Sequence, residues 1–261
     1  MKFAQHYKYI KKSETNLINH DEKSSIRLNK YLSESGALSR REGDRAIEVG
    51  RVKINGVTAT LGSKVFPGDI VTLDQKVIEP VQQKVYIALH KPTGIVSTTD
   101  TAITDNMITF MNYPEQIFPI GRLDRNSSGL ILLTNDGDIV NKILRAEYGH
   151  DKEYIVTVEP AIKDDFLQKM SQGVEIYNPV THQTQKTLPS KIKKVDSHTF
   201  NIVLNQGLNR QIRRMCDSLG YVVKTLKRVR IMHIKLDHLP EGYWRYLTKD
   251  ELIKLNEAIQ S

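Results

Sequence analysis

The chain has 261 residues, of which 39% are hydrophobic, enough for one large domain or two modest domains with real cores. Its 38 Lys and Arg against 30 Asp and Glu give a net charge of +8, which favours a polyanionic partner, either a nucleic acid or a membrane surface. The lone cysteine, Cys216, excludes an internal disulfide and a multi-cysteine metal site, and the histidines show no ligand pattern.

Residues 1–25 are polar and basic and have no sustained apolar period, so we predict a flexible arm that either contacts RNA or is simply solvated. Residues 1–9 lack the continuous apolar region of a signal peptide. No segment has the length and apolarity of a membrane span. We therefore expect a cytoplasmic protein without a membrane partner.

Residues 26–80 have the pattern of a small domain made of helices and short strands. After a first short helix, Ser39 and Glu42 form a capping box at the start of a second helix, and Gly50 is placed to end it. Asn55-Gly56 suits a tight turn between two short strands. The domain is predicted to have a minimal core with a basic helix outside it.

Basic residues gather on the two predicted helices of this domain. Free N–H groups and the dipole at a helix start add to arginine charge, so the second helix suits phosphate binding. A merely solvated helix surface is an equally good explanation from charge alone. The candidate RNA-binding residues of the domain are Lys30, Arg40, Arg41 and Arg45.

Residues 81–84 are polar and are predicted to be a linker. Residues 85–261 then alternate strand and helix patterns, which indicates an α+β domain. A strand at 85–89 leads into a loop containing His90 and Lys91, and 97–113 suggests a loop and a short helix.

The central stretch places the carboxylate of Asp124 between Arg122 and Arg125 in a polar loop. The buried strand expected at 130–133 follows, closed by an Asn-Asp-Gly turn at 135–137. Chemistry tends to occur where a rigid strand holds an acid on a loop. The alternative is that Asp124 only caps a turn or pairs with Arg122.

The elements beyond this stretch are predicted from their apolar spacing. They are a helix over 139–144, a strand over 152–158, a helix over 161–173, a hairpin or loop over 174–189, strands near 192 and over 200–204, a helix over 212–219, a closing strand over 242–247 and a terminal helix capped by Thr248 and Glu251. On these grounds alone, Tyr154 is an aromatic residue at the core edge.

The helix expected after Gln206 carries arginines at its start. Ile212 and Cys216 belong to its apolar stripe, so Cys216 is interpreted as a packed thiol rather than a nucleophile. Arg210 and Arg213 lie on the margin of that stripe, where clustered guanidinium groups bind phosphate or a carboxylate.

Several ordered motifs, over about residues 26–256, resemble those of the RsuA/RluB/RluE/RluF family of pseudouridine synthases. The resemblance is greatest to the members that modify the RNA of the large ribosomal subunit. The motifs are Lys91-Pro92-Thr93-Gly94, Gly121-Arg122-Leu123-Asp124 with Gly129-Leu130 and Thr134-Asn135-Asp136-Gly137, Lys152-Glu153-Tyr154, Ile212-Arg213, and Thr225-Leu226-Lys227-Arg228. Residues 26–56 resemble the S-four-type RNA-binding domain, which by itself implies RNA rather than one reaction. His90 stands where that family usually has Asn, and we expect a hydrogen-bonding loop residue there.

The resemblance implies a role for each matching residue. Asp124 is the nucleophile or the base, Arg213 pairs with it, and Tyr154 stacks on the target base with a possible part in proton transfer. Leu226 closes the uracil pocket. The other expected substrate-binding residues are Lys91, Arg122, Leu123, Arg125, Arg210, Gln211 and Ile212.

The implied function is isomerisation of a flipped-out uridine to pseudouridine in large-subunit ribosomal RNA, with a transfer RNA as a second candidate substrate. The implied fold is a mainly antiparallel mixed sheet flanked by helices around a central cleft, in a monomer that needs no cofactor or metal. One alternative is a non-catalytic RNA-binding ribosome-assembly factor, which would have lost Asp124, Tyr154 or Arg213. Another is a nucleic-acid hydrolase, which would need clustered acids for metal where this chain has arginines.

Overall fold

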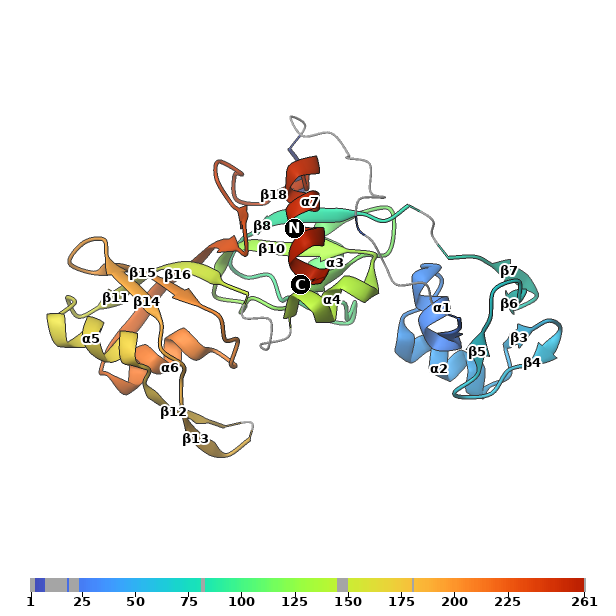
Figure 1. Ribbon diagram of the computed structural model, residues 1–261, viewed down its shortest axis with the longest axis horizontal. Helices are drawn as coiled ribbons and strands as arrows, with labels where there is room; N and C mark the ends of the chain where they lie inside the picture. The colour runs from blue at the N-terminus through green and yellow to red at the C-terminus, as the bar shows by residue number, and fades with distance from the viewer. Residues whose placement is uncertain are drawn as a thin grey trace.

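The computed structural model describes residues 3–7, 18, 24–80, 83–144, 150–179 and 181–260. Figure 1 shows a small domain, whose elements lie between Ile26 and Ile78, beside a larger one built on a long sheet. We call these the small domain and the large domain. Among the described residues, no helix is both long enough and apolar enough to cross a membrane.

The small domain packs two helices against short strands. Its helices are α1 (Leu28–Glu34) and α2 (Arg40–Glu48), and its strands are β2 (Ile26–Arg27), β3 (Val52–Ile54), β4 (Val57–Thr58), β5 (Lys64–Val65), β6 (Val71–Leu73) and β7 (Lys76–Ile78). Leu28 and Leu32 of α1 are fully buried with Val52 and Val71 of the four-stranded sheet. This confirms the predicted pattern of helices and short strands.

Local chemistry explains where these small-domain elements begin and turn. The Ser39 side chain accepts a hydrogen bond from the Glu42 N–H, and the Glu42 carboxylate accepts one from the Ser39 N–H, which confirms the capping box. Asn55 and Gly56 both have positive φ, 51° and 82°, as the turn between β3 and β4 requires.

The large domain is organised on a ten-stranded sheet in the order β1-β18-β8-β10-β16-β11-β15-β14, with β17 beside β16 and β9 beside β10. The strands are β1 (Gln5–His6), β8 (Tyr86–Lys91), β9 (Phe118–Ile120), β10 (Ser128–Thr134), β11 (Lys152–Glu159), β14 (Lys191–Lys194), β15 (Thr199–Leu204), β16 (Val222–Ile231), β17 (Ile234–Lys235) and β18 (Tyr243–Tyr246). Only β1–β18 and β10–β16 pair in parallel, so the sheet is mixed and mainly antiparallel, as predicted.

Helices cover this sheet in two groups. They are α3 (Met107–Met111), α4 (Gly137–Leu144), α5 (Asp164–Gln172), α6 (Gln211–Ser218) and α7 (Lys249–Gln260), and β12 (Glu175–Asn178) with β13 (Gln183–Lys186) forms a separate hairpin. One core joins α3, α5 and α6 to the sheet, and the other joins α4 and α7 to it. The α+β class predicted from the alternation of patterns is confirmed.

Strand β10 is the element that supports the central loop. Leu130, Ile131, Leu132 and Leu133 are each at most 1% exposed, because Leu130 and Leu132 point into one core and Ile131 and Leu133 into the other, on the opposite face of the sheet. At its end, the Thr134 hydroxyl donates to the Val85 carbonyl at 2.6 Å. The predicted buried strand is confirmed. The loop that precedes β10 therefore ends on a rigidly held strand.

Strand β16 was missing from the predicted elements, although it is central and runs between β10 and β11. Its burial does not alternate strictly, since β-bulges interrupt its register with β11 at Glu153/Tyr154 and at Thr157/Val158. His90 is another difference: it lies in strand β8 rather than in a loop. It is buried, and its Nδ1 lies 2.7 Å from the Leu239 carbonyl oxygen.

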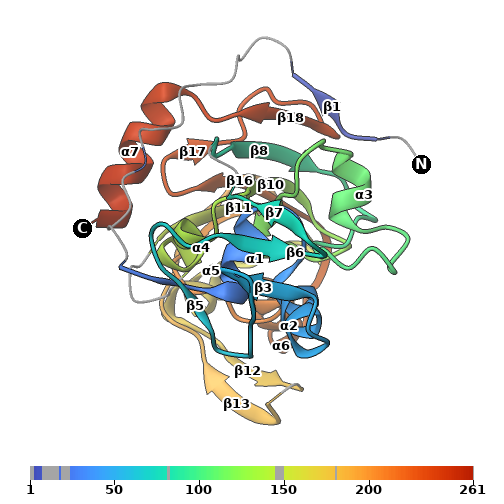
Figure 2. The ribbon, with the colours of Figure 1, turned by 90° about the vertical axis from the view of Figure 1, so that its right-hand side faces the viewer.

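Part of the predicted N-terminal arm lies against the large domain. Gln5 and His6 form β1, which extends the sheet beside β18, as Figure 2 shows. The His6 ring stacks on Trp244 with centroids 4.2 Å apart, and Ile18 is 6% exposed in the core shared with α7. These residues are therefore not a free arm, because they pair and pack. The rest of that prediction, and residues 81–82 of the linker, lie outside the described residues.

Candidate active site

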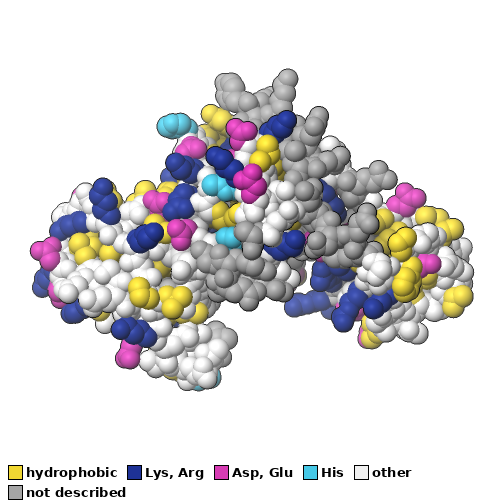
Figure 3. Space-filling model, viewed as in Figure 1, with side chains coloured by type: hydrophobic (Ala, Val, Ile, Leu, Met, Phe, Trp, Pro, Cys, Tyr) yellow, Lys and Arg dark blue, Asp and Glu magenta, His cyan; other side chains and the backbone are white. Residues whose placement is uncertain are grey.

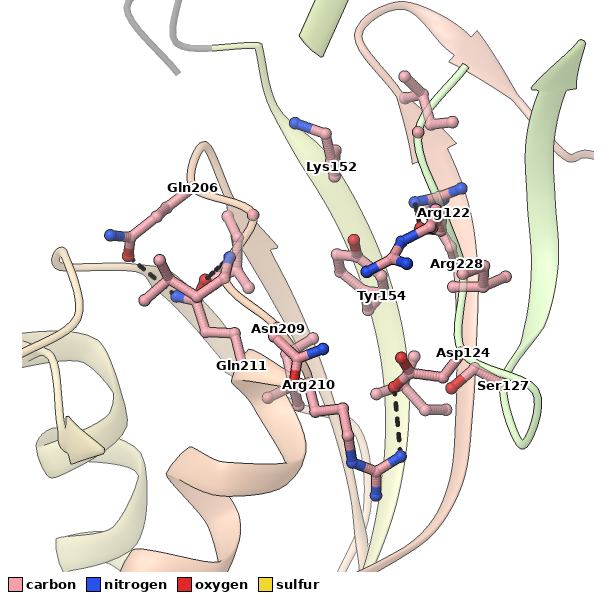
Figure 4. Close-up of a pocket in the computed structure, with 18 of the residues that line it drawn as sticks. Arg122, Asp124, Ser127, Lys152, Tyr154, Gln206, Asn209, Arg210, Gln211 and Arg228 are labelled. Atoms are coloured by element: carbon pink, nitrogen blue, oxygen red, sulfur yellow. Dashed lines mark hydrogen bonds and ion pairs between the residues drawn. The ribbon is translucent and has the colours of Figure 1, made fainter. Parts of the chain in front are cut away.

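A cavity of about 590 Å³ opens between the loop that precedes β10 and the start of α6. Strands β11 and β16 form its floor. Residues from well-separated parts of the chain line it: Arg122, Leu123, Asp124, Ser127, Lys152, Tyr154, Arg210, Gln211, Ile212, Arg213, Leu226 and Arg228. Figure 4 shows Arg122, Asp124, Ser127, Lys152, Tyr154, Arg210, Gln211 and Arg228 around one hollow.

Asp124 lies in the loop between β9 and β10. Its Oδ2 is 3.7 Å from Arg210 Nη1, the ion pair drawn in Figure 4. It is also 3.8 Å from Arg213 Nε, and both distances are beyond hydrogen-bond length. Its side chain is 32% exposed, facing the cavity. The carboxylate thus has two positive neighbours while its oxygens remain accessible to a bound molecule.

Arg213 is fixed by the loop that carries Asp124. Its Nη2 donates to the Asn126 carbonyl at 2.8 Å and to Ser127 Oγ at 3.1 Å. Its Nη1 donates to the Val223 carbonyl at 3.3 Å. Burial, and then the charge of Arg210, lowers the pKa of Arg213, whereas Asp124 raises it. The guanidinium therefore joins α6, the loop between β9 and β10, and β16 around the acid.

Tyr154 and Leu226 supply the apolar surface of the cavity. They come from the adjacent strands β11 and β16, where Leu226 pairs with Val156. Leu226 is 6% exposed and Tyr154 is half-buried with its ring in the wall. An aromatic ring and an aliphatic side chain in one cavity suit a flat ring as ligand.

The start of α6 is shaped by Arg210, which adopts a left-handed conformation with φ of 51°. Gln211 holds this turn, because its Oε1 accepts from the Leu208 N–H at 3.1 Å and its Nε2 donates to Gln206 at 3.2 Å. Ile212 packs into the core beside them. This start of α6 brings Arg210 and Arg213 toward Asp124.

Lys91 is placed differently from its predicted substrate-binding role. It is fully buried, and its Nζ donates to the carbonyls of Pro92 at 2.8 Å and Ile95 at 2.9 Å. Burial, followed by the charge of Arg228, lowers the pKa of Lys91 to about 8. Lys91 does not line the cavity, so we correct its role to holding the loop after β8.

Arg125 also lies outside the cavity wall. Its Nη2 pairs with Asp105 at 2.7 Å and its Nε donates to the Gly94 carbonyl at 3.1 Å, although the side chain is 59% exposed. Arg122 and Leu123 do line the cavity, as predicted for substrate-binding residues. Arg125 therefore lies at the surface beside the cavity and not in its wall.

The arginines of the small domain lie outside the cavity. Arg40, Arg41 and Arg45 are exposed on α2, and Figure 3 shows basic side chains gathered where the small domain faces the large one. Lys30, predicted to bind RNA, instead forms ion pairs with Glu34 and with Asp138 of α4, and its side chain is 13% exposed. It thereby connects the two domains.

Arg228 and Lys152 line the cavity but were not among the predicted site residues. Arg228 is 4% exposed, and it stands two positions after Leu226, so the signal was present in the same motif. Burial, and then the charge of Arg228, lowers the pKa of Lys152. Within the described ranges, no three His, Cys, Asp or Glu residues gather as a metal site would require.

Comparison with known proteins gives matches over both domains. The family model for RNA pseudouridylate synthase matches residues 85–218, and the model for the S4 domain matches residues 26–71. The dual-specificity RNA pseudouridine synthase RluF of Shigella flexneri is 54% identical over 240 residues, which is 91% of this chain and 81% of that protein.

More distant relatives extend these matches. The ribosomal large subunit pseudouridine synthase B of Bacillus subtilis (strain 168) is 35% identical over 232 residues, covering 88% of this chain and 95% of that protein. A crystal structure of a pseudouridylate synthase superposes with a TM-score of 0.65 at 29% identity, over 88% of this chain and 99% of that one.

Proposed function

The chain belongs to the RNA pseudouridine synthase family, and on this premise we propose that Asp124, Arg213, Tyr154 and Leu226 form its active site. It is an enzyme that isomerises uridine to pseudouridine in ribosomal RNA, and it carries an S4 domain ahead of its synthase domain. The observation that carries the site assignment is the meeting of these four side chains in one cavity.

The reaction breaks the N1–C1′ bond of uridine, turns the base and joins C5 to C1′. The C5 proton leaves and N1 gains a proton, so no oxidant, reductant or imported group is required. Asp124 acts at the sugar, either by attacking it or by removing a 2′ proton. Its accessible carboxylate between Arg210 and Arg213 supports this role.

Tyr154 and Leu226 hold the base while it is detached. Stacking on the Tyr154 ring keeps the free uracil in place, which conserves the entropy already lost on binding. Leu226 closes the other side of the cavity. Arg213 positions the loop of Asp124 through its hydrogen bonds to Asn126 and Ser127.

The target uridine must leave its helix or loop to enter the cavity. Arg122 and Arg210 at the cavity wall, with Arg125 outside it, hold the displaced strand. Arg40, Arg41 and Arg45 of the small domain bind phosphates of the neighbouring RNA.

The substrate is large-subunit ribosomal RNA, with a transfer RNA as second substrate, which fits relatives named dual-specificity enzymes. The enzyme acts as a cytoplasmic monomer.

A non-catalytic assembly factor is not favoured. Such a protein would have no reason to keep the acid, its guanidinium partner and the aromatic platform in one cavity, and all three are together here. The relatives over most of the chain are also named as synthases.

The test is tritium release from ribosomal RNA labelled at C5 of uridine. The wild-type protein is expected to release tritium, and Asp124→Asn to abolish release while RNA binding stays within a few-fold. Asp165→Asn is a matched control, because Asp165 is exposed on α5, does not line the cavity and pairs with Lys169 at the surface. Normal release by Asp124→Asn would remove the assignment of Asp124.

A further inference from the structure

Lys30 of the small domain makes an ion pair with the large domain. Its Nζ pairs with the carboxylate of Asp138, and also with Glu34, one turn further along α1, at 3.3 Å. The Lys30 side chain is 13% exposed and the Asp138 side chain 27%, so the pair lies largely out of solvent. An ammonium group enclosed between two carboxylates is not available to an RNA phosphate. The role of Lys30 therefore lies in the contact between the domains.

The ion pair is at the start of a helix that also forms part of the cavity wall. Asp138 is in the first turn of α4, whereas Ile143 and Leu144 at the end of α4 line the cavity. At 1.5 Å per residue, Asp138 and Leu144 are about 9 Å apart along the helix axis. Ile139 and Ile143 are buried in the core that joins α4 to the sheet. The small domain is thus docked on a rigid part of the cavity (Figure 1).

The docking of α1 also places α2, the helix that carries the proposed phosphate-binding arginines. The two helices share one core, and the Asn29 side chain of α1 donates to Asp44 of α2 at 2.9 Å. At the start of α2, Arg40 Nη2 lies 3.7 Å from the position that a Cβ on Gly137, the first residue of α4, would take. Both helices of the small domain therefore approach the same end of α4.

A fixed position of α2 matters because one RNA molecule must reach two surfaces at once. Its phosphates contact α2 while its flipped-out uridine occupies the cavity, so the separation of the two surfaces selects the uridine that can enter. Domains of one chain move relative to one another unless contacts hold them. A freely moving small domain would hold the RNA at many separations, and only a few of these would bring the uridine to Asp124.

We propose that the Lys30–Asp138 ion pair is a positioning contact, which docks the small domain on α4 and sets the distance between the phosphates bound on α2 and the uridine in the cavity. This inference rests on the proposed function of the cavity and of α2. Lys30 and Asp138 are positioning residues and touch no reacting atom. Their loss therefore lowers the rate of a bound RNA rather than the affinity for RNA.

The experiment exchanges the two charges. Lys30→Glu and Asp138→Lys each place like charges together, and the double variant Lys30→Glu/Asp138→Lys restores an ion pair in the reverse orientation. Lys76→Glu is the matched control, because it makes the same charge change at an exposed position on β7 of the same domain. Its combination with Asp138→Lys tests whether any added negative charge produces a rescue.

The measured quantity is tritium release from ribosomal RNA labelled at C5 of uridine, in a single turnover at saturating enzyme. Lys30→Glu and Asp138→Lys are each expected to lower this rate by about 10-fold, and the double variant to return to within about 3-fold of the wild type. Lys76→Glu is expected to stay within about 3-fold and to rescue nothing. Asp138→Lys is the sharper single variant, because it slows the reaction although it adds positive charge to a protein that binds RNA.

Two further measurements separate positioning from RNA binding and from misfolding. Filter binding is expected to show no greater loss of RNA affinity in Lys30→Glu than in Lys76→Glu. Small-angle scattering of the free protein is expected to show a larger radius of gyration in each single variant and a return in the double variant. Thermal melting checks folding. Where a reversed charge prevents folding, Lys30→Gln and Asp138→Asn replace it, and their combination should lose no more than either alone.

Two results overturn the positioning contact. One is a loss in Lys30→Glu that Asp138→Lys does not reverse, which would mean that Lys30 contacts RNA. The other is a rate in the folded single variants equal to or above that of the wild type. Both leave the proposed function standing if the wild type releases tritium and Asp124→Asn does not. A wild-type protein that forms no pseudouridine in ribosomal RNA overturns both together.

Discussion

At the scale of single residues, Arg213 makes a set of contacts that requires the planar shape of a guanidinium as well as its positive charge. Its two terminal nitrogens contact Asn126, Ser127 and Val223 at once, while its Nε faces Asp124. A planar fork makes these contacts together, whereas a lysine ammonium is a point charge on a flexible stem. The loop of Asp124 thus depends on the shape of the arginine.

We therefore expect Arg213→Lys to lower kcat by about 100-fold with a smaller change in KM, because the acid is displaced while RNA contacts remain. The matched control is Arg214→Lys, because Arg214 does not line the cavity and its guanidinium donates to the Tyr177 carbonyl and to the Asn209 side chain rather than to the loop of Asp124. Steady-state tritium release from labelled RNA measures both. Equal losses in the two variants would contradict a specific role for Arg213.

The burial of Lys91 has a consequence for stability against pH. Its pKa is about 8 in the folded protein and near 10.5 in the unfolded chain. A lowered pKa means that the folded state binds this proton less well, so its contribution to stability is present above pH 10.5 and is lost as pH falls toward 8.

The stability of the wild type relative to Lys91→Met is therefore expected to rise between pH 7 and pH 10, by about 2 to 3 kcal/mol. Urea unfolding of both proteins at the two pH values measures the change, because other titrating groups cancel in the difference. A difference independent of pH would show that Lys91 keeps an ordinary affinity for its proton.

At the scale of elements, the contact of β10 with β16 requires Gly129. Its φ is +112°, and an added Cβ would lie 2.2 Å from the Arg228 carbonyl oxygen. The clash involves the backbone of the strand that carries Leu226 and Arg228, so relief must separate the two strands. Close approach at this glycine thus holds β10 against β16, the strand that carries Leu226 and Arg228.

Gly129→Ala is expected to lower the free energy of unfolding by about 3 kcal/mol or more. Gly220→Ala provides the comparison, because Gly220 also has positive φ, +80°, yet nothing lies within 4 Å of an added Cβ. Gly220→Ala is expected to lower the free energy of unfolding by about 1 kcal/mol, which measures the backbone strain without a steric clash. Denaturant unfolding separates the two, and equal costs would rule out the clash as the cause.

Elements with a clear apolar period could be predicted from the sequence. The capped start of α2, the buried strand β10 and the terminal helix α7 with its Thr248–Glu251 cap are all confirmed. Strand β16 was not predicted, because its bulges break the alternation that identifies a strand. Strand β1 has only two residues and is held by its pairing with β18 and by the stacking of His6 on Trp244, which no local pattern in the sequence predicts.

The site residues, too, divide into those that a sequence motif predicts and those that only the three-dimensional arrangement reveals. Asp124, Tyr154, Arg213 and Leu226 carry motif signals and meet in one cavity. Lys91 carries an equally clear motif signal but is buried under the loop, because a motif preserves structural residues as well as those that touch a ligand. Lys30 pairs with Asp138, a residue of the other domain, and only the coordinates reveal that partner.

At the scale of the whole molecule, the small domain offers a charged surface that is separate from the cavity. Replacing Arg40, Arg41 and Arg45 by Gln is expected to weaken RNA binding and to reduce the slope of log K against log salt by about 2 to 3. The rate at saturating RNA should stay within about 3-fold, since these residues lie outside the cavity wall.

Filter binding across a salt series measures the slope. The matched control replaces Lys163, Lys191 and Lys193 by Gln. These lysines are exposed at the end of the large domain opposite the small one, so their replacement removes the same amount of positive charge far from α2 (Figure 1). Equal slopes for both triple variants would mean that net charge, and not the arginine helix, attracts the RNA.

The pairing of β1 with β18 bears on how this protein is dissected. Since β1 and Ile18 precede the small domain and β8 follows it, the large domain holds both ends of the small one. A deletion of everything before residue 83 would uncover the hydrogen-bonding edge of β18, and such bare edges invite self-association. Excising residues 24–80 alone and rejoining the ends would keep that edge sealed.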